Sequence, residues 1–61
     1  MKASDLIKLL KSNGWREVRQ AGSHVILKHD GNPDNISVPV HGKKDVPKGT
    51  LNDALKAAGL K

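Results

Sequence analysis

The chain has 61 residues, 36% of them hydrophobic, and carries 11 lysines and arginines against six aspartates and glutamates, for a formal net charge of +5. A chain this short is expected to form one domain, residues 1–61, whose small core leaves no room for a deep substrate cavity. The lack of cysteine excludes disulfides and thiol chemistry. No apolar run approaches the roughly 18 residues of a membrane span, and no signal peptide is apparent, so we expect a cytoplasmic location.

The first predicted element is an amphipathic helix over residues 4–13. Its apolar residues fall on one arc of the helical surface: Leu6, Ile7, Leu9 and Leu10. Ser4 is the expected N-cap, and Gly14 after Asn13 is a C-cap signal. This helix should bury one face and expose its lysines.

Three strands are expected next: residues 15–20, 23–29 and 36–40. A short turn, Ala21-Gly22, separates the first two, and residues 30–35 are predicted to be a loop because all six are turn formers. The third segment alternates with period 2, and its Pro39 cannot donate a ladder hydrogen bond, which favours an edge strand. The short connections imply an antiparallel meander.

A second amphipathic helix has its apolar residues at the spacing i, i+3, i+4, i+7: Leu51, Ala54, Leu55 and Ala58. It should end at Gly59, but its start has two alternatives. Asp45 could cap it with Pro47 in the first turn, or Thr50 could cap it with Asp53 three residues later. The order α-β-β-β-α predicts an α+β fold in which two helices cover one face of a three-stranded antiparallel sheet. The other face stays open to solvent or a ligand.

The second strand carries the strongest candidate for chemistry. If Val25 and Leu27 face the helices, His24 and Lys28 point to the open face, where we expect them about 7 Å apart along the strand, the span of a phosphodiester and its neighbours. An imidazole acts as acid or base near neutral pH, and a lysine can hold charge that develops on a phosphoryl oxygen. The alternative is an ordinary strand histidine, solvated or hydrogen-bonded to Ser23.

The other candidate ligands do not form a metal-binding pattern. His29 and His41 have no zinc-type spacing with His24, and the acidic loop at residues 30–35 lacks the spacing of an EF-hand. We therefore expect no metal and no cofactor. Trp15 could stack on a base, but a lone Trp after a helix-ending glycine is more often part of the core.

A basic loop precedes the second helix. It contains three lysines: Lys43, Lys44 and Lys48. They cluster at the positive end of the helix dipole, and a phosphate bound at the free N–H groups there would relieve the repulsion. The net charge likewise favours nucleic acid over an anionic membrane as partner. A solvated basic loop on a soluble protein is the equal alternative.

Several motifs together resemble the HicA toxins of bacterial type II toxin–antitoxin systems: Gly14-Trp15, Gly22-Ser23-His24, Val38-Pro39, Gly49-Thr50-Leu51 and residues 55–60, LKAAGL. The resemblance spans residues 6–60. It implies a double-stranded-RNA-binding-domain-like fold and an mRNA interferase, an endoribonuclease that blocks translation. It also implies that His24 is catalytic and that a HicB antitoxin binds the toxin and covers the site. The family often has an aromatic residue where this chain has Leu27.

The leading hypothesis is a toxin that cuts single-stranded mRNA without a metal, with His24 as the base toward the ribose 2′-hydroxyl. Spacing and charge predict further residues that bind phosphate or RNA: Ser23, Lys28, Lys43, Lys44 and Lys48. The rival is a non-catalytic RNA-binding module that recognises the phosphate backbone. A third possibility is an interaction subunit that works only through a protein partner.

Overall fold

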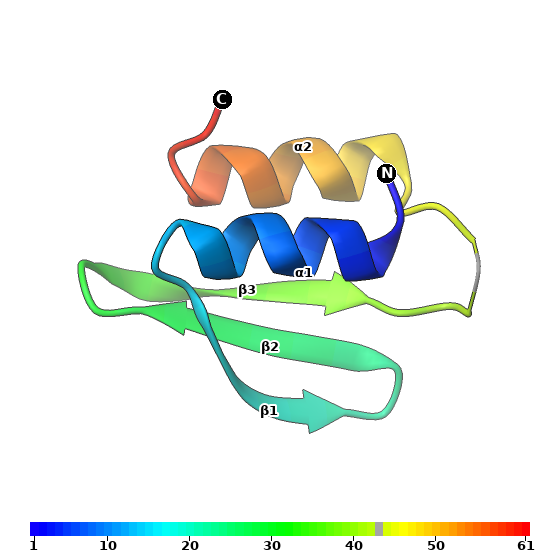
Figure 1. Ribbon diagram of the computed structural model, residues 1–61, viewed down its shortest axis with the longest axis horizontal. Coiled ribbons are helices and arrows are strands. Elements are labelled where there is room, and N and C mark those ends of the chain that lie inside the picture. Colours follow the sequence, from blue (N-terminus) through cyan, green and yellow to red (C-terminus); the bar gives the residue numbers. More distant parts are fainter. Residues whose placement is uncertain (43) are drawn as a thin grey trace.

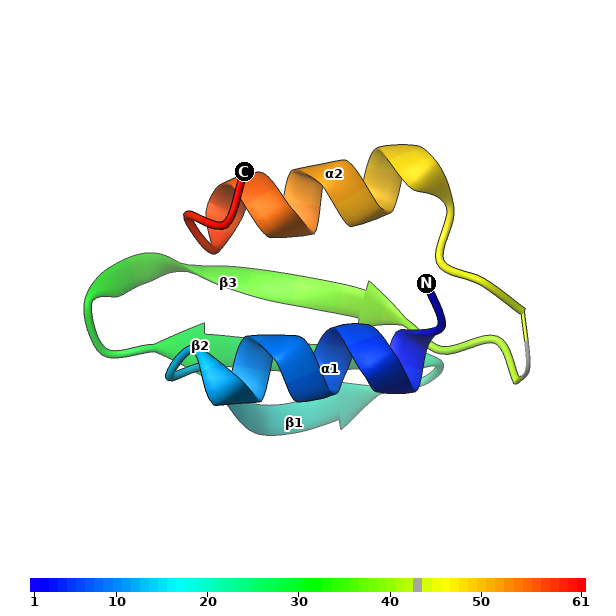
Figure 2. The same cartoon turned by 45° about the horizontal axis from the view of Figure 1, so that its top comes forward.

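The computed structural model describes residues 1–42 and 44–61. Its elements follow in chain order: α1 (Ala3–Ser12), β1 (Arg16–Ala21), β2 (His24–His29), β3 (Asn32–Pro39) and α2 (Lys48–Ala57). The strands form one antiparallel sheet in the order β1-β2-β3, so β2 is central. Both helices lie on the same side of this sheet and begin at the end where β3 stops (Figures 1 and 2). The predicted α-β-β-β-α order and α+β class are confirmed.

The core lies between the sheet and the helices. α1 packs against β1 and β3, and α2 packs against β3. The buried apolar residues are Ala3, Leu6, Leu10, Trp15, Val25, Leu27, Ile36, Val38, Val46 and Ala54. Alternate residues of β2 and β3 therefore point toward the helices, as the period of a strand requires. Trp15 is only 4% exposed, which confirms its interpretation as a core residue and removes it as a stacking platform for a base.

The first helix ends as predicted but does not begin as predicted. Ser4 lies inside α1, whose N-cap is Lys2 with no side-chain cap, because a bridge to the loop before α2 holds Lys2 in an extended conformation. At the other end, Gly14 has a φ of +91° and the Trp15 N–H donates to the Leu10 carbonyl at 3.1 Å. This is the arrangement of a glycine C-cap.

Neither predicted start of the second helix is correct. The N-cap of α2 is Pro47, again without a side-chain cap, and its carbonyl accepts a hydrogen bond from the Leu51 N–H at 2.8 Å. Asp45 pairs with Lys2 instead, through an isolated β-bridge and a 3.7 Å ion pair. Thr50 lies inside the helix. Asp45 does not cap the helix because it pairs instead with the N-terminal segment, which is distant in sequence.

The predicted loop at residues 30–35 is confirmed for residues 30 and 31, which form a turn, but it is wrong for residues 32–35, because β3 begins at Asn32. Asn32 pairs with His29, and a register shift on this hairpin places residues 33–35 in an irregular part of the strand. The Asn32 side chain anchors that part: its Oδ1 accepts from the Asp34 N–H at 2.9 Å, and its Nδ2 donates to the Ala57 carbonyl at 3.0 Å. The edge position predicted from Pro39 is confirmed, since β3 is an outer strand.

None of the described helices is long and apolar enough to cross a membrane.

Candidate functional site

The turn before β2 determines where His24 lies. Gly22 and Ser23 alone connect Ala21 to its register partner His24. Gly22 has a φ of +59°, and a positive φ at the first of two turn residues is the pattern of a type II′ hairpin. A side chain at Gly22 would meet no atom within 4 Å, so the backbone conformation alone calls for glycine. Ser23 is the second turn residue, not a strand residue, and its carbonyl accepts from the Val40 N–H at 2.7 Å.

His24 projects from the side of the sheet opposite the helices. Val25 and Leu27 are buried, whereas His24 and Lys28 are exposed, so the predicted alternation along β2 is confirmed. The imidazole has no hydrogen bond, ion pair or ring contact with any other described residue, and the alternative of a bond to Ser23 is not seen. Both ring nitrogens are therefore available to a ligand.

Two short residues flank the imidazole across the sheet. Ala21 lies opposite His24 on β1, and Pro39 lies opposite it on β3. Residues that pair directly across strands point to the same face, so these three form one row on the uncovered side. Neither neighbour is long enough to cover the ring. Beneath a bound polymer, the row would present the imidazole as its only polar side chain.

The next row along the open face contains a residue that sequence analysis missed. Arg19, Ile26 and Ser37 pair across the three strands. Ile26 is half-buried at the centre of this row, and Arg19 is exposed. The sequence did contain evidence for the position of Arg19. A two-residue turn sets Ala21 opposite His24, and Arg19, two residues before Ala21, then lies on the same face.

Lys28 is not adjacent to His24. Four positions separate the two residues, which on a strand is about 13 Å, so the expected 7 Å was wrong. Lys28 lies instead opposite Arg16, whose guanidinium forms a 2.9 Å ion pair with Asp30. It therefore belongs to the far end of the open face.

The basic loop lies at the same end of the molecule as His24. Figures 1 and 2 show the β1–β2 turn, the loop between β3 and α2, and the start of α2 together at this end. Lys44 and Lys48 are exposed there, and the Lys44 N–H donates to the His41 carbonyl at 3.2 Å. Lys43 lies outside the described residues. The structure thus brings Ser23, Lys44 and Lys48 to the end that holds His24.

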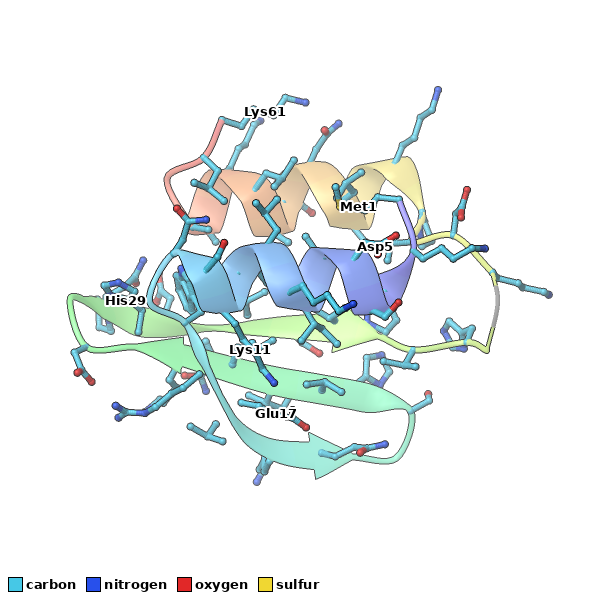
Figure 3. All side chains as sticks on the ribbon, viewed as in Figure 1. Met1, Asp5, Lys11, Glu17, His29 and Lys61 are labelled. Carbon is cyan, nitrogen blue, oxygen red and sulfur yellow. The ribbon has the colours of Figure 1, made fainter. Side chains whose placement is uncertain are left out.

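The other histidine of β2 has a structural role. His29 lies at the opposite end of the sheet (Figure 3). Its Nδ1 accepts a hydrogen bond from the Gly31 N–H at 2.9 Å, and its ring centroid lies 5.4 Å from that of Trp15. His41 is exposed in the basic loop. In the part of the chain that the structure describes, no three acidic, histidine or cysteine side chains lie together as metal ligands.

Two hollows of the described surface lie away from His24. One, of about 300 Å³, lies between β3 and α2 and includes Ser37 and Asp53. The other, of about 270 Å³, includes Trp15 and His29. His24 lines neither of them, and its exposed imidazole lies beside only the short side chains of Ala21 and Pro39, so the surface around it is open. An open face suits an extended polymer better than a small molecule, which is usually bound in a concave pocket.

Comparison with known proteins identifies the family. The family described as HicA toxin of bacterial toxin-antitoxin matches residues 3–60. A solved structure described as "HicA3 and HicB3 toxin-antitoxin complex" is 38% identical and has a TM-score of 0.72, with 100% of this chain and 97% of that chain covered. Among curated proteins none matches the sequence. The chain therefore belongs to the HicA toxin family of bacterial toxin–antitoxin systems.

Proposed function

We propose that residues 1–61 form a single RNA-cleaving toxin domain, an mRNA interferase that cuts single-stranded mRNA in the cytoplasm and so blocks translation. The observation that carries this proposal is the exposed imidazole of His24, which has no partner among the described residues and lies on the uncovered face of the sheet. Membership of the HicA toxin family and the open surface around the ring support the same function.

The reaction needs only groups that the RNA and one histidine supply. An imidazole nitrogen of His24 removes the proton of a ribose 2′-hydroxyl, and the 2′-oxygen attacks the adjacent phosphorus. As the new P–O2′ bond forms, the P–O5′ bond breaks, and the 5′-oxygen takes a proton from the imidazolium or from water. The products are a 2′,3′-cyclic phosphate and a 5′-hydroxyl end. Positioned proton transfer of this kind accelerates reactions by about 10² to 10⁴.

The basic residues hold the RNA in this proposal. Lys44 and Lys48 are exposed at the end of the molecule that carries His24, and Lys43 belongs to the same loop by sequence. Ser23 would contact the backbone beside the scissile phosphate. Lys28, about 13 Å from His24 along the strand, would contact a neighbouring nucleotide instead.

A HicB-type antitoxin is the proposed protein partner. The solved structure that this chain resembles is of HicA3 together with HicB3. An acidic antitoxin that binds the open face would cover His24 and would be attracted by the net charge of +5. Binding of this partner would inhibit the toxin by keeping RNA from the imidazole.

The test is cleavage of a single-stranded RNA by purified protein in EDTA, with wild type and His24→Ala compared. We expect wild type to leave cyclic phosphate ends and His24→Ala to bind the RNA without cutting it. Cleavage by a folded His24→Ala variant at the wild-type rate would reject the role of the histidine. Binding without cleavage by the wild type, with or without added metal, would favour the non-catalytic RNA-binding module instead.

A further inference from the structure

Arg19 lies closer to His24 on the open face than any other described arginine or lysine of the sheet. It pairs with Ile26, and Ala21, two residues later, pairs with His24. Positions that are diagonal across two strands are about 7–8 Å apart, within reach of a long side chain. Lys28 is nearly twice as far from the imidazole along β2 itself.

A β-bulge removes the one acid of β1 from this face. The register of β1 shifts between Glu17 and Arg19, so Val18 is an extra residue without a partner on β2. In a regular strand Glu17 would share the face of Arg19, because side chains two residues apart point the same way. The shift instead sets Glu17 opposite the buried Leu27, on the helix side. There its Oε2 lies 3.6 Å from the Nζ of Lys11 in α1 (Figure 3). Bulges commonly re-aim a side chain next to an active site.

Of the other acids near the sheet, two are held in ion pairs, and Asp34 lies in the irregular start of β3, toward the end of the sheet away from His24. Asp30 pairs with Arg16 at 2.9 Å, and Asp45 pairs with Lys2. Arg19 has no ion pair with any described residue. Its planar guanidinium, exposed on the face of His24, is therefore free to form the bidentate contact with phosphate for which arginine is suited.

We infer that Arg19 is a second catalytic residue of this toxin, which contacts the non-bridging oxygens of the phosphate that is being cut. The inference rests on the proposed ribonuclease function. As the 2′-oxygen attacks phosphorus, negative charge grows on those oxygens, and a fixed cation beside them lowers the barrier. Arg16, on the same strand and face but paired with Asp30 and farther from His24, has no such role.

The experiment compares wild type with four variants: Arg19→Gln, Arg19→Lys, Arg16→Gln and His24→Ala. Two quantities are measured for each, the single-turnover cleavage rate of a single-stranded RNA and the affinity for the same sequence with every 2′-hydroxyl methylated, which removes the nucleophile. Arg19→Gln should slow cleavage by about 10² to 10³, the usual effect of removing one such donor, and weaken binding far less. Arg19→Lys should recover part of the rate, and Arg16→Gln should stay close to wild type.

The outcomes separate this inference from the function beneath it. If His24→Ala is inactive while Arg19→Gln cuts as fast as Arg16→Gln, the assignment of Arg19 is overturned and the ribonuclease stands. If Arg19→Gln slows cleavage only by the factor by which it weakens binding, the assignment of Arg19 is also overturned, because Arg19 would then be a binding residue. Cleavage by His24→Ala at the wild-type rate rejects the histidine as the base and, with it, the assignment of Arg19 beside that histidine. Failure of the wild type to cut RNA overturns the ribonuclease itself. Thermal unfolding of each variant checks the fold, and Arg19→Lys retains a readout if the glutamine variant unfolds.

Discussion

The Nδ1 atom of His29 accepts a hydrogen bond from the backbone N–H of Gly31 at a distance of 2.9 Å. Five residues earlier on the same strand, the ring of His24 has no partner among the described residues. An odd spacing puts the two side chains on opposite faces of the sheet. Position 29 faces the helices and Trp15, and position 24 faces the open side. One strand thus carries one structural histidine and one that is available to a substrate.

Replacement of the two histidines should therefore have opposite consequences. His29→Ala removes the acceptor for the Gly31 N–H and the contact with Trp15, and should lower the free energy of unfolding by about 1–2 kcal/mol. His24→Ala should change it by less than about 0.5 kcal/mol, since the exposed ring makes no contact of this kind. Urea denaturation followed by Trp15 fluorescence measures both. Equal stability losses in the two variants would contradict the division of roles.

Gly14→Ala should destabilise the protein for two separable reasons. The φ of +91° strains any residue with a side chain, and a Cβ would lie 2.7 Å from the Nε2 of His29. The backbone strain alone is of the order of 1–3 kcal/mol. In a His29→Ala background the steric part should disappear, so the cost of Gly14→Ala should fall. Gly49→Ala is the matched control, because its Cβ meets nothing within 4 Å in a helix; it should be neutral or stabilising by up to about 1 kcal/mol.

Gly22 should require its positive φ rather than its small size. Gly22→Ala should cost about 1–2 kcal/mol, because a left-handed φ is unfavourable for an L-residue. It should also reduce RNA cleavage, since strain at the turn shifts the first residue of β2, His24. A chain of 61 residues is accessible to chemical synthesis, and D-alanine at position 22 should retain both stability and activity. If D-alanine proved as damaging as L-alanine, the turn conformation would not be the reason for the glycine.

The lysines near His24 should act through RNA phosphates. Lys44→Gln and Lys48→Gln should each weaken binding to single-stranded RNA and reduce the slope of log K against log salt by about 0.7. Lys8 is exposed on α1, which lies on the helix-covered side of the sheet (Figure 2), so it is the matched control, and Lys8→Gln should leave the slope unchanged. Fluorescence anisotropy at several salt concentrations gives the slopes. If the slopes of all three variants equalled that of the wild type, the RNA would not contact the basic loop.

Local pattern predicted which residues of β2 share a face, but not which face is buried. Side chains alternate between the two faces of any extended strand, so His24 and Lys28 had to lie on the face opposite to Val25 and Leu27. Because Ile26 is also apolar, only the structure decided that Val25 and Leu27 are the buried pair and that His24 is exposed. The helix end at Gly14 was predicted for a similar reason, because a C-cap depends on residues a few positions apart. The motif at residues 22–24 gave both the turn and the candidate catalytic residue.

The chain alone thus determined the order of its elements, the apolar faces of its helices and the turn that places His24 at the start of β2, since each depends on residues close together in sequence. Only the tertiary structure decided which charged groups accompany that imidazole. Strand pairing places Arg19 beside His24. A bulge turns Glu17 to the other face, where it forms an ion pair with Lys11. Likewise, Asp45 pairs with Lys2 and does not cap α2. These partners are far apart along the chain, and their contacts exist only once the folded backbone brings the strands and helices together.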